Sequence, residues 1–185
     1  GVGDAVNLKK PFLIVIQHPV TSEIGKNRKH VEITLNAVHE LGIPAICFWP
    51  NADAGTDEVS KAIRNFREIK NPEHMRFIKD LPAEEFVGLL KNTACLVGNS
   101  SAGLKECSWL GTPVVNIGSR QHGRMRSGNV LDAGYDKKKI KEAILSQIKH
   151  GKYAPSAIYY KRGCARNISR VMATARLYVQ KSFHD

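Results

Sequence analysis

The sequence has no apolar run long enough to cross a membrane, and its first residues lack the basic and then apolar pattern of a secretion signal. Only four of its 185 residues are cysteine, and none of them forms a Cys-x-x-Cys pair. A short secreted chain typically carries a disulfide framework, so this pattern favours a cytoplasmic protein. We therefore expect no membrane partner.

The spacing typical of a metal site is also absent. The seven histidines do not combine with cysteines or carboxylates at the intervals that metal ligands need, and we expect no metal. Aromatic residues make up 7% of the chain and are not interleaved with basic residues as in a platform for single-stranded nucleic acid. A composition of 42% hydrophobic and 24% charged residues is typical of a globular domain with a sizeable core.

Acidic residues are scarce in the last third of the chain. Residues 120–185 carry 15 Lys and Arg against four Asp and Glu, and this excess equals the whole formal net charge of +11. The first 119 residues are balanced, with 13 of each sign. A basic excess of this kind indicates nucleic acid, a membrane surface or an acidic ligand as partner.

The pattern of apolar residues predicts alternating strands and helices. A continuous apolar run at 12–16 is typical of a strand buried on both faces. Further strands are expected at 44–49, 75–78, 94–97, 112–117 and near 130–131, and helices at 26–41, after 56, after 82, just before 111, at 136–150 and at about 163–183. This alternation predicts an α/β fold, a doubly wound, Rossmann-like parallel sheet.

The predicted organisation has three parts. Residues 1–10, which begin without Met, are expected to be a linker or an expression remnant. Residues 11–150 form the α/β domain, and residues 151–185 form a loop and a final helix. If the strand order is the common 3-2-1-4-5-6, the loops 17–23 and 98–101 flank the crevice where ligands bind.

The segment Gly98-Asn99-Ser100-Ser101-Ala102-Gly103 joins a predicted strand to a helix. Backbone N–H groups and hydroxyls at such a helix start favour a phosphate, although Ser and Asn are equally the preferred residues of an ordinary helix cap. The segment has neither the P-loop ending nor the Gly-x-Gly-x-x-Gly pattern. Glu106, five residues beyond Ser101, can accept hydrogen bonds from ribose hydroxyls or simply complement the helix dipole.

Three further features lie at predicted strand ends. Residues 120–126 carry three arginines, whose planar guanidinium groups suit pyrophosphate but also occur in solvated basic loops. His18 closes the first strand, where a structural histidine is the more common alternative to a catalytic one. Residues 50–55 follow the second strand and can be an ordinary turn.

The last predicted helix carries a basic stripe of Arg162, Arg166 and Arg170, spaced four residues apart. Such a stripe can bind nucleic acid or can form a solvated helix face. We favour the solvated face, because no aromatic platform accompanies the stripe. No nucleic-acid partner is therefore expected, and a basic nucleic-acid-binding module remains the second alternative.

Taken together, these motifs resemble the hydrolysing branch of the UDP-N-acetylglucosamine 2-epimerase family, over nearly the whole chain from about Pro11. The resemblance rests on His18-Pro19-Val20-Thr21, Pro50-Asn51-Ala52-Asp53-Ala54-Gly55, Gly98-Asn99-Ser100-Ser101-Ala102-Gly103 with Glu106, and Gly118-Ser119-Arg120-Gln121-His122-Gly123-Arg124 with Asn129-Val130. The non-hydrolysing branch typically shows Asp-Ser-Gly-Gly and Thr-Glu-Arg-Pro at two of these places. Both departures favour the hydrolysing branch.

The resemblance implies the C-terminal half of a GT-B architecture, in which two Rossmann-like domains enclose the active site and the second holds UDP. It implies that four residues contact the diphosphate region, namely His18, Ser100, Ser101 and Arg120. His18 is also the candidate catalytic residue. Glu106 would contact the ribose hydroxyls, and Asn51 would face the nucleotide. Leu81 would line the uracil pocket. The UDP-binding set implied is His18, Asn51, Leu81, Ser100, Ser101, Glu106 and Arg120.

The implied reaction removes the proton at the sugar C2 with loss of UDP and then adds water, and it requires neither NAD nor a metal, so no cofactor is expected. In this family the acid and base carboxylates come largely from the N-terminal domain. The chain alone is therefore expected to be inactive, with its last helix packing toward that missing domain and a homo-oligomer when full length. A non-hydrolysing epimerase or another GT-B glycosyltransferase is the alternative.

Overall fold

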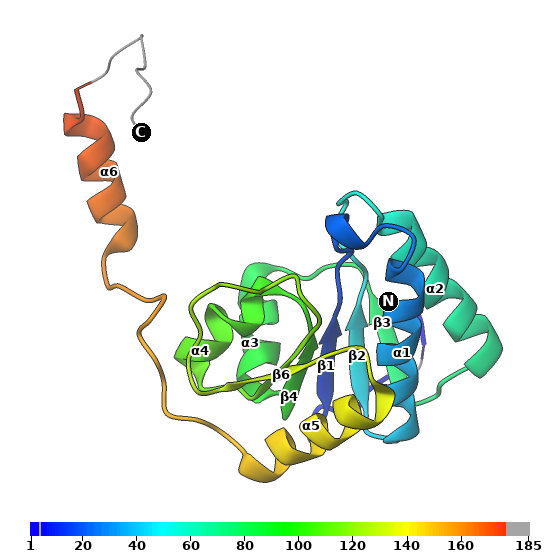
Figure 1. Ribbon diagram of the computed structural model, residues 1–185. Helices are drawn as coiled ribbons and strands as arrows, with labels where there is room; N and C mark the ends of the chain where they lie inside the picture. Colours follow the sequence, from blue (N-terminus) through cyan, green and yellow to red (C-terminus); the bar gives the residue numbers. More distant parts are fainter. Residues whose placement is uncertain (4, 177–185) are drawn as a thin grey trace.

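The computed structural model describes residues 1–3 and 5–176 (Figure 1). Within them, six parallel strands form one sheet in the order β3-β2-β1-β4-β5-β6. The strands are β1 (Leu13–Ile16), β2 (Ala45–Phe48), β3 (Met75–Ile78), β4 (Cys95–Gly98), β5 (Val114–Ile117) and β6 (Val130–Ala133). The predicted doubly wound α/β fold is confirmed, and the observed order is the common one on which the position of the crevice was conditional.

Helices cover both faces of the sheet. The helices α1 (Asn27–Glu40), α2 (Thr56–Lys70) and α5 (Lys137–His150) pack on one face, and α3 (Ala83–Asn92) and α4 (Glu106–Leu110) pack on the other. The continuous apolar run of β1 follows from this double cover. Leu13 and Val15 pack in the core under α1, α2 and α5, whereas Ile14 packs in the core under α3 and α4. Successive side chains of a strand point to opposite faces, so a strand covered twice must be apolar throughout.

The helix ends follow local chemistry. Pro82 precedes α3, whose first turn carries Glu84 and Glu85 at the positive end of the helix dipole. The side chain of Asp136 accepts a hydrogen bond from the backbone N–H of Lys139 at 2.8 Å and caps α5. Proline before the first turn, acids within it and an aspartate cap are all typical of helix starts.

The first residues of the chain lie along the edge of the sheet. The backbone N–H of Val2 donates to the carbonyl of Phe77 at 2.8 Å, and the N–H of Phe77 donates back to Val2 at 2.8 Å. This antiparallel bridge pairs part of the otherwise open edge of β3. The segment expected to be a linker therefore contacts the domain at its start.

The last described helix stands apart from the sheet. An extended arm leads from α5 to α6 (Cys164–Thr174), which has no buried residue and projects away from the domain (Figure 1). The prediction of a helix to residue 183 is wrong for its described part, because Ala175 leaves the helical conformation with ψ near 132°. A short helix that buries none of its described residues is held mainly by its own hydrogen bonds, which are marginal at this length. Residues 177–183 of that prediction lie outside the described residues.

Candidate functional site

The loops that follow β1 and β4 are joined to each other by one buried side chain. The backbone N–H of His18 donates to Oδ1 of Asn99 at 2.7 Å, and Nδ2 of Asn99 donates to the carbonyl of His18 at 2.9 Å. Asn99 is fully buried, so its amide replaces the sheet hydrogen bonds where the two strands diverge. The crevice at the switch of strand order is therefore closed at its base.

Gly98 permits this close approach. It has a φ of 130°, and a Cβ placed there would lie 2.0 Å from the carbonyl oxygen of Ile16. Any other residue would therefore push β1 and β4 apart at the point where their loops begin. The glycine at the start of the Asn-Ser-Ser segment is required by the fold, whatever it also does for a ligand.

His18 sits at the base of the crevice and is only 7% exposed. Its Nδ1 accepts a hydrogen bond from the backbone N–H of Asn51 at 3.1 Å, which brings the loop after β2 into the site. Burial, assisted by the positive charge of Arg120 and opposed by Asp53, lowers the pKa of His18 to about 4. The ring is therefore neutral at neutral pH, and because Nδ1 accepts, its proton sits on Nε2.

Arg120 comes from the loop after β5 and is held by two groups. Its Nη1 donates to the carbonyl of Asn99 at 3.4 Å, and its Nη2 donates to Oδ2 of Asp53 at 3.2 Å. The neighbouring Gln121 donates from Nε2 to the same Asn99 carbonyl at 2.7 Å. The Arg120 side chain keeps 28% of its surface exposed, so its remaining N–H groups are available to an anion.

A hollow of about 410 Å³ opens beside Arg120. Loops after β1, β2 and β5 surround it, with the lining residues Pro19, Val20, Thr21, Ser22, Asp53, Ala54, Ser119 and Arg120. Parallel strands bring their carboxyl ends to one edge of a sheet, which is where α/β proteins bind their ligands. The hollow has the position expected for the ligand crevice.

The first serine of the Asn-Ser-Ser segment has a structural role. The Oγ of Ser100 accepts from the backbone N–H of Ala102 at 3.3 Å and caps the short 3-10 turn η2 (Ser101–Gly103). Ser100 and Ser101 are both half-buried. The helix cap that the sequence offered as the alternative to a phosphate site is thus present at Ser100.

The structure brings together some of the predicted site residues and leaves others apart. His18, Asn51 and Arg120 share the contacts described above. Leu81 lines a separate apolar hollow between the N-terminal segment and α3. Glu106 is exposed in a third hollow on α4, beside Trp109, whose ring stacks on Tyr160 with centroids 3.9 Å apart.

Two residues that hold the site were given no role of their own from the sequence. Asp53 pairs with Arg120, and Asn99 joins three loops, yet both lie in segments that were quoted only as whole motifs. Their residue types are those of ordinary turns, so composition could not separate them from turn formers. The position of Asn99 directly after the glycine that ends the fourth apolar run is the signal that could have found it.

Two further findings concern the described part of the chain. No three His, Cys, Asp or Glu side chains within it gather in a way that could hold a metal ion. None of its helices has the length and apolar character needed to span a membrane.

The sequence model of the family described as UDP-N-acetylglucosamine 2-epimerase matches residues 3–173. A Legionella pneumophila protein named UDP-N,N'-diacetylbacillosamine 2-epimerase (hydrolyzing) is 33% identical over 152 residues, which cover 81% of this chain and 38% of that protein. Polysialic acid biosynthesis protein P7 of Escherichia coli is 30% identical over 145 residues, which cover 75% of this chain and 35% of that protein. The chain thus spans little more than a third of the length of these relatives.

Solved structures show the same fold. UDP-GlcNAc 2-epimerase from Neisseria meningitidis, bound to UDP-GlcNAc, matches with a TM-score of 0.71 at 13% identity over 91% of this chain and 46% of that one. An Escherichia coli ADP-heptose heptosyltransferase II matches with a TM-score of 0.55 at 12% identity, over 76% of this chain and 47% of that one. These likenesses show a Rossmann-like half of the GT-B architecture. Since the family model matches nearly the whole sequence, the chain belongs to the UDP-N-acetylglucosamine 2-epimerase family.

Proposed function

We propose that this chain is the UDP-binding half of a hydrolysing UDP-N-acetylglucosamine 2-epimerase. The complete enzyme would convert UDP-N-acetylglucosamine and water to N-acetylmannosamine and UDP, or act on a close diacetamido sugar, in sialic-acid-type sugar synthesis. The observation that carries the proposal is the convergence of Arg120, neutral His18 and the Asn51 loop on one crevice at the switch of strand order.

The crevice offers two kinds of donor to a diphosphate. Arg120 provides a permanent charge and a planar fork of N–H groups, which match phosphate oxygens in geometry. His18 provides an Nε2–H without a second full charge, since burial lowers its pKa to about 4. Ser100 and Ser101 add hydroxyls at the rim. Asp53 contacts one Nη of the Arg120 guanidinium, and a phosphate would bind to the remaining N–H groups or replace this carboxylate.

These donors would act on the leaving group of the reaction. A base removes the C2 proton of the sugar, the C1–O bond breaks, and its electron pair leaves on the β-phosphate of UDP. Arg120 and His18 would stabilise that developing charge. Water then adds its hydroxyl at C1 and a proton returns at C2 from the opposite face, which gives the inverted free sugar. The route requires no metal and no redox cofactor.

The groups that work on C2 are proposed to lie in a second domain. The chain matches little more than a third of its curated relatives, and in the resemblance the acid and base carboxylates belong to the other half. We therefore propose that this chain binds UDP without turning over a sugar, and that the full-length enzyme is a homo-oligomer. The ribose would reach Glu106, and the uracil would reach the apolar hollow at Leu81.

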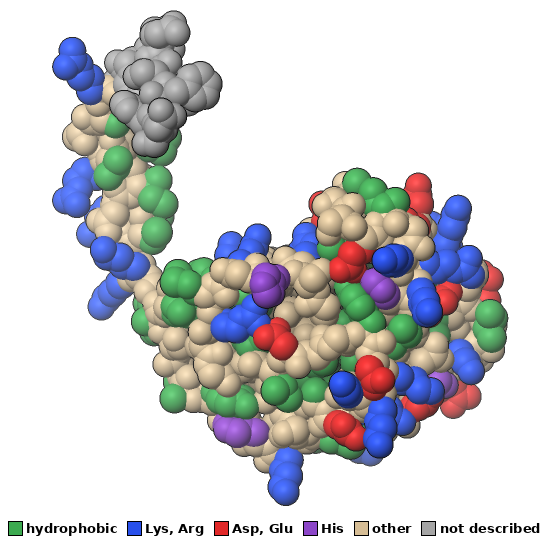
Figure 2. All heavy atoms as spheres, in the orientation of Figure 1, with side chains coloured by type: hydrophobic (Ala, Val, Ile, Leu, Met, Phe, Trp, Pro, Cys, Tyr) green, Lys and Arg blue, Asp and Glu red, His purple; other side chains and the backbone are tan. Residues whose placement is uncertain are grey.

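The C-terminal arm is proposed to contact that second domain. Helix α6 exposes Ile168, Val171 and Met172 to solvent, at 53%, 61% and 73%. Figure 2 shows hydrophobic side chains along one side of this helix and Lys and Arg along the other. Three large apolar residues on one face of a projecting helix favour burial against a partner. Residues 11–150 would then be the UDP-binding domain, and residues 151–185 the arm.

Two observations support the hydrolysing branch. The Legionella relative and a Campylobacter jejuni relative, 28% identical over 129 residues, are both named as hydrolysing enzymes. The chain also has Asn99-Ser100-Ser101 where the non-hydrolysing branch typically has Asp-Ser-Gly. A non-hydrolysing epimerase is the remaining alternative, and a GT-B glycosyltransferase is a further one because a heptosyltransferase shares the fold.

Product analysis of the full-length protein tests this proposal. Incubation with UDP-N-acetylglucosamine alone should yield free N-acetylmannosamine and UDP. A UDP-linked product would indicate the non-hydrolysing reaction, and no product without an acceptor would indicate a transferase. Calorimetry of this chain with UDP tests the binding role, and a folded sample that shows no affinity for UDP would contradict it.

A further inference from the structure

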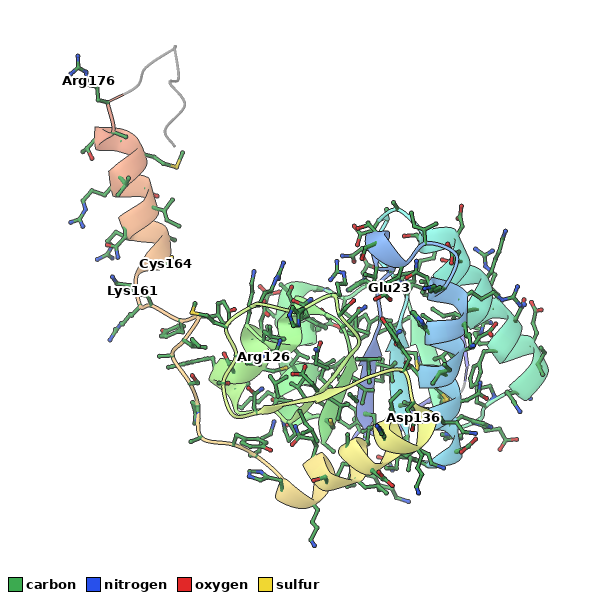
Figure 3. All side chains as sticks on the ribbon, viewed as in Figure 1. Glu23, Arg126, Asp136, Lys161, Cys164 and Arg176 are labelled. Carbon is green, nitrogen blue, oxygen red and sulfur yellow. The ribbon has the colours of Figure 1, made fainter. Side chains whose placement is uncertain are left out.

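A carboxylate just outside the crevice joins three separate segments of the chain. Glu23 is the last residue of the 3-10 turn η1 (Thr21–Glu23), which lies in the connection from β1 to α1 (Figure 3). Its Oε1 accepts a hydrogen bond from Oγ of Ser119 at 2.5 Å, and its Oε2 accepts one from the hydroxyl of Tyr135 at 2.8 Å. Nδ1 of His30 lies 3.1 Å from the same Oε2. Both carboxylate oxygens are therefore in use.

The partners of Glu23 also pack against one another. The rings of His30 and Tyr135 stack, with centroids 3.5 Å apart and an interplanar angle of 8°. The Tyr135 hydroxyl fills the space beside Gly118, where an added Cβ would lie 2.1 Å from it. Only a glycine lets the loop after β5 lie directly on this ring, so the start of that loop has one well-defined position.

The pKa of Glu23 is consistent with a carboxylate that accepts strong hydrogen bonds. Burial alone would raise the pKa of Glu23, but hydrogen bonds from Ser119 and Tyr135, together with the neighbouring His30, outweigh it and hold the pKa below its ordinary value. Glu23 is therefore ionised at neutral pH. Hydrogen bonds to an ionised carboxylate are roughly twice as strong as neutral ones.

Glu23 does not line the hollow beside Arg120, but its partner Ser119 does. Ser119 directly precedes Arg120, so two carboxylates hold consecutive residues of one loop: Glu23 holds Ser119, and Asp53 holds Arg120. We propose that Glu23 is a positioning residue, which holds the Ser119–Arg120 loop where Arg120 meets the diphosphate. This inference rests on the proposed function of the site.

The direction in which Glu23→Gln changes the Kd for UDP distinguishes a positioning role from a purely electrostatic effect. Glu23 carries a negative charge close to the place of a dianionic ligand, and its removal by charge alone would strengthen UDP binding. Loss of positioning acts in the opposite direction, because an untethered loop must be ordered again when UDP binds. Glu23→Gln is expected to raise the Kd for UDP about tenfold, measured by calorimetry.

Two further variants test whether Glu23 acts through Arg120. In an Arg120→Ala background, Glu23→Gln should cause no further loss of UDP affinity, because neighbouring residues that work as a unit are not additive. Tyr135→Phe removes one hydrogen bond to Glu23 without changing a charge, and it should raise the Kd by a smaller factor. Amide hydrogen exchange at residues 118–121 should become faster in both Glu23→Gln and Tyr135→Phe.

Glu40→Gln is the matched control. Glu40 also accepts two hydrogen bonds, from Lys137 at 2.5 Å and from Lys141 at 2.8 Å, but it lies at the end of α1 that is distant from the crevice loops. It should alter thermal stability and leave the Kd for UDP unchanged. An unchanged or lower Kd in Glu23→Gln, or an effect that adds fully to that of Arg120→Ala, would overturn the positioning role alone. Absence of UDP binding by the unsubstituted protein would overturn the proposed function instead.

Discussion

Nη2 of Arg120 donates a hydrogen bond to Oδ2 of Asp53 at 3.2 Å, beside the hollow that the crevice loops surround. The pair joins the loop after β5 to the loop after β2, and both side chains are partly exposed. An exposed ion pair contributes little to stability, about 0–1 kcal/mol. Its more important effect is that it holds the guanidinium in place beside the hollow.

Arg120→Ala should weaken UDP binding about 10- to 100-fold, since a hydrogen bond to a charged group contributes about 1.5–3 kcal/mol. Calorimetry with UDP measures the change. Arg124→Ala is the matched control, because Arg124 lies in the same loop, carries the same charge and is exposed. Equal losses in the two variants would mean that the loop attracts UDP only by its overall charge.

His18 should make the stability of the protein depend on pH. Its pKa is about 4 in the folded protein and 6.5 as its ordinary value, so the unfolded chain binds the proton more readily between these values. The stabilisation is complete above pH 6.5 and is lost as the pH falls toward 4. The free energy of unfolding should fall by about 2 kcal/mol more between pH 7 and pH 5 than in His18→Gln.

The neighbours of His18 provide a direct check by NMR titration of its ring. Burial dominates the shift, Arg120 lowers the pKa further, and Asp53 raises it. Arg120→Ala should therefore raise the pKa of His18, and Asp53→Asn should lower it. Shifts of the same sign in both variants would be inconsistent with the described contacts.

Gly98→Ala should reduce the free energy of unfolding by about 3 kcal/mol, because the new Cβ would meet the Ile16 carbonyl and the backbone is in the left-handed region. Urea denaturation measures the loss. Gly88→Ala makes the same chemical change within α3, where a Cβ meets nothing within 4 Å. This control should stabilise the protein by about 0.5–1 kcal/mol, as alanine does in a helix.

The four cysteines should divide into one reactive and three inert thiols. Cys47, Cys95 and Cys107 are buried, and burial raises the pKa of each, that of Cys95 to about 12. Cys164 is exposed on α6. A thiol-specific chromogenic reagent should label one cysteine rapidly in the native protein and all four in denaturant. Rapid labelling that persists in Cys164→Ser would contradict this assignment.

Much of the fold could be predicted because buried segments have a recognisable pattern of apolar residues in the sequence. Strands such as Leu13–Ile16 are covered on both faces and are apolar throughout, and helix starts carry caps such as Asp136. The end of α6 was not predictable in the same way. Its apolar periodicity continues past Thr174, but no packing within the described residues supports a longer helix.

The candidate site was predictable only at the level of loops. The rule that ligands bind at the switch of strand order selected the segments around His18 and Asn99, and the basic loop selected Arg120. The side chains that hold the site residues in place could not be predicted, because each lies far along the chain from the residue that it contacts. Asp53 and Arg120 are 67 positions apart, and Glu23 and Ser119 are 96 positions apart.

The amino-acid sequence alone established the α/β class, the number and kind of elements and the family resemblance, since each follows from local periodicity, turn and cap residues and short motifs, whereas the strand order came from the structure. Only the tertiary structure showed that His18 is buried and neutral, that Asp53 holds Arg120, and that Glu23 holds Ser119. A pKa and a hydrogen bond depend on which atoms meet in space, and the winding of the chain around the sheet decides this.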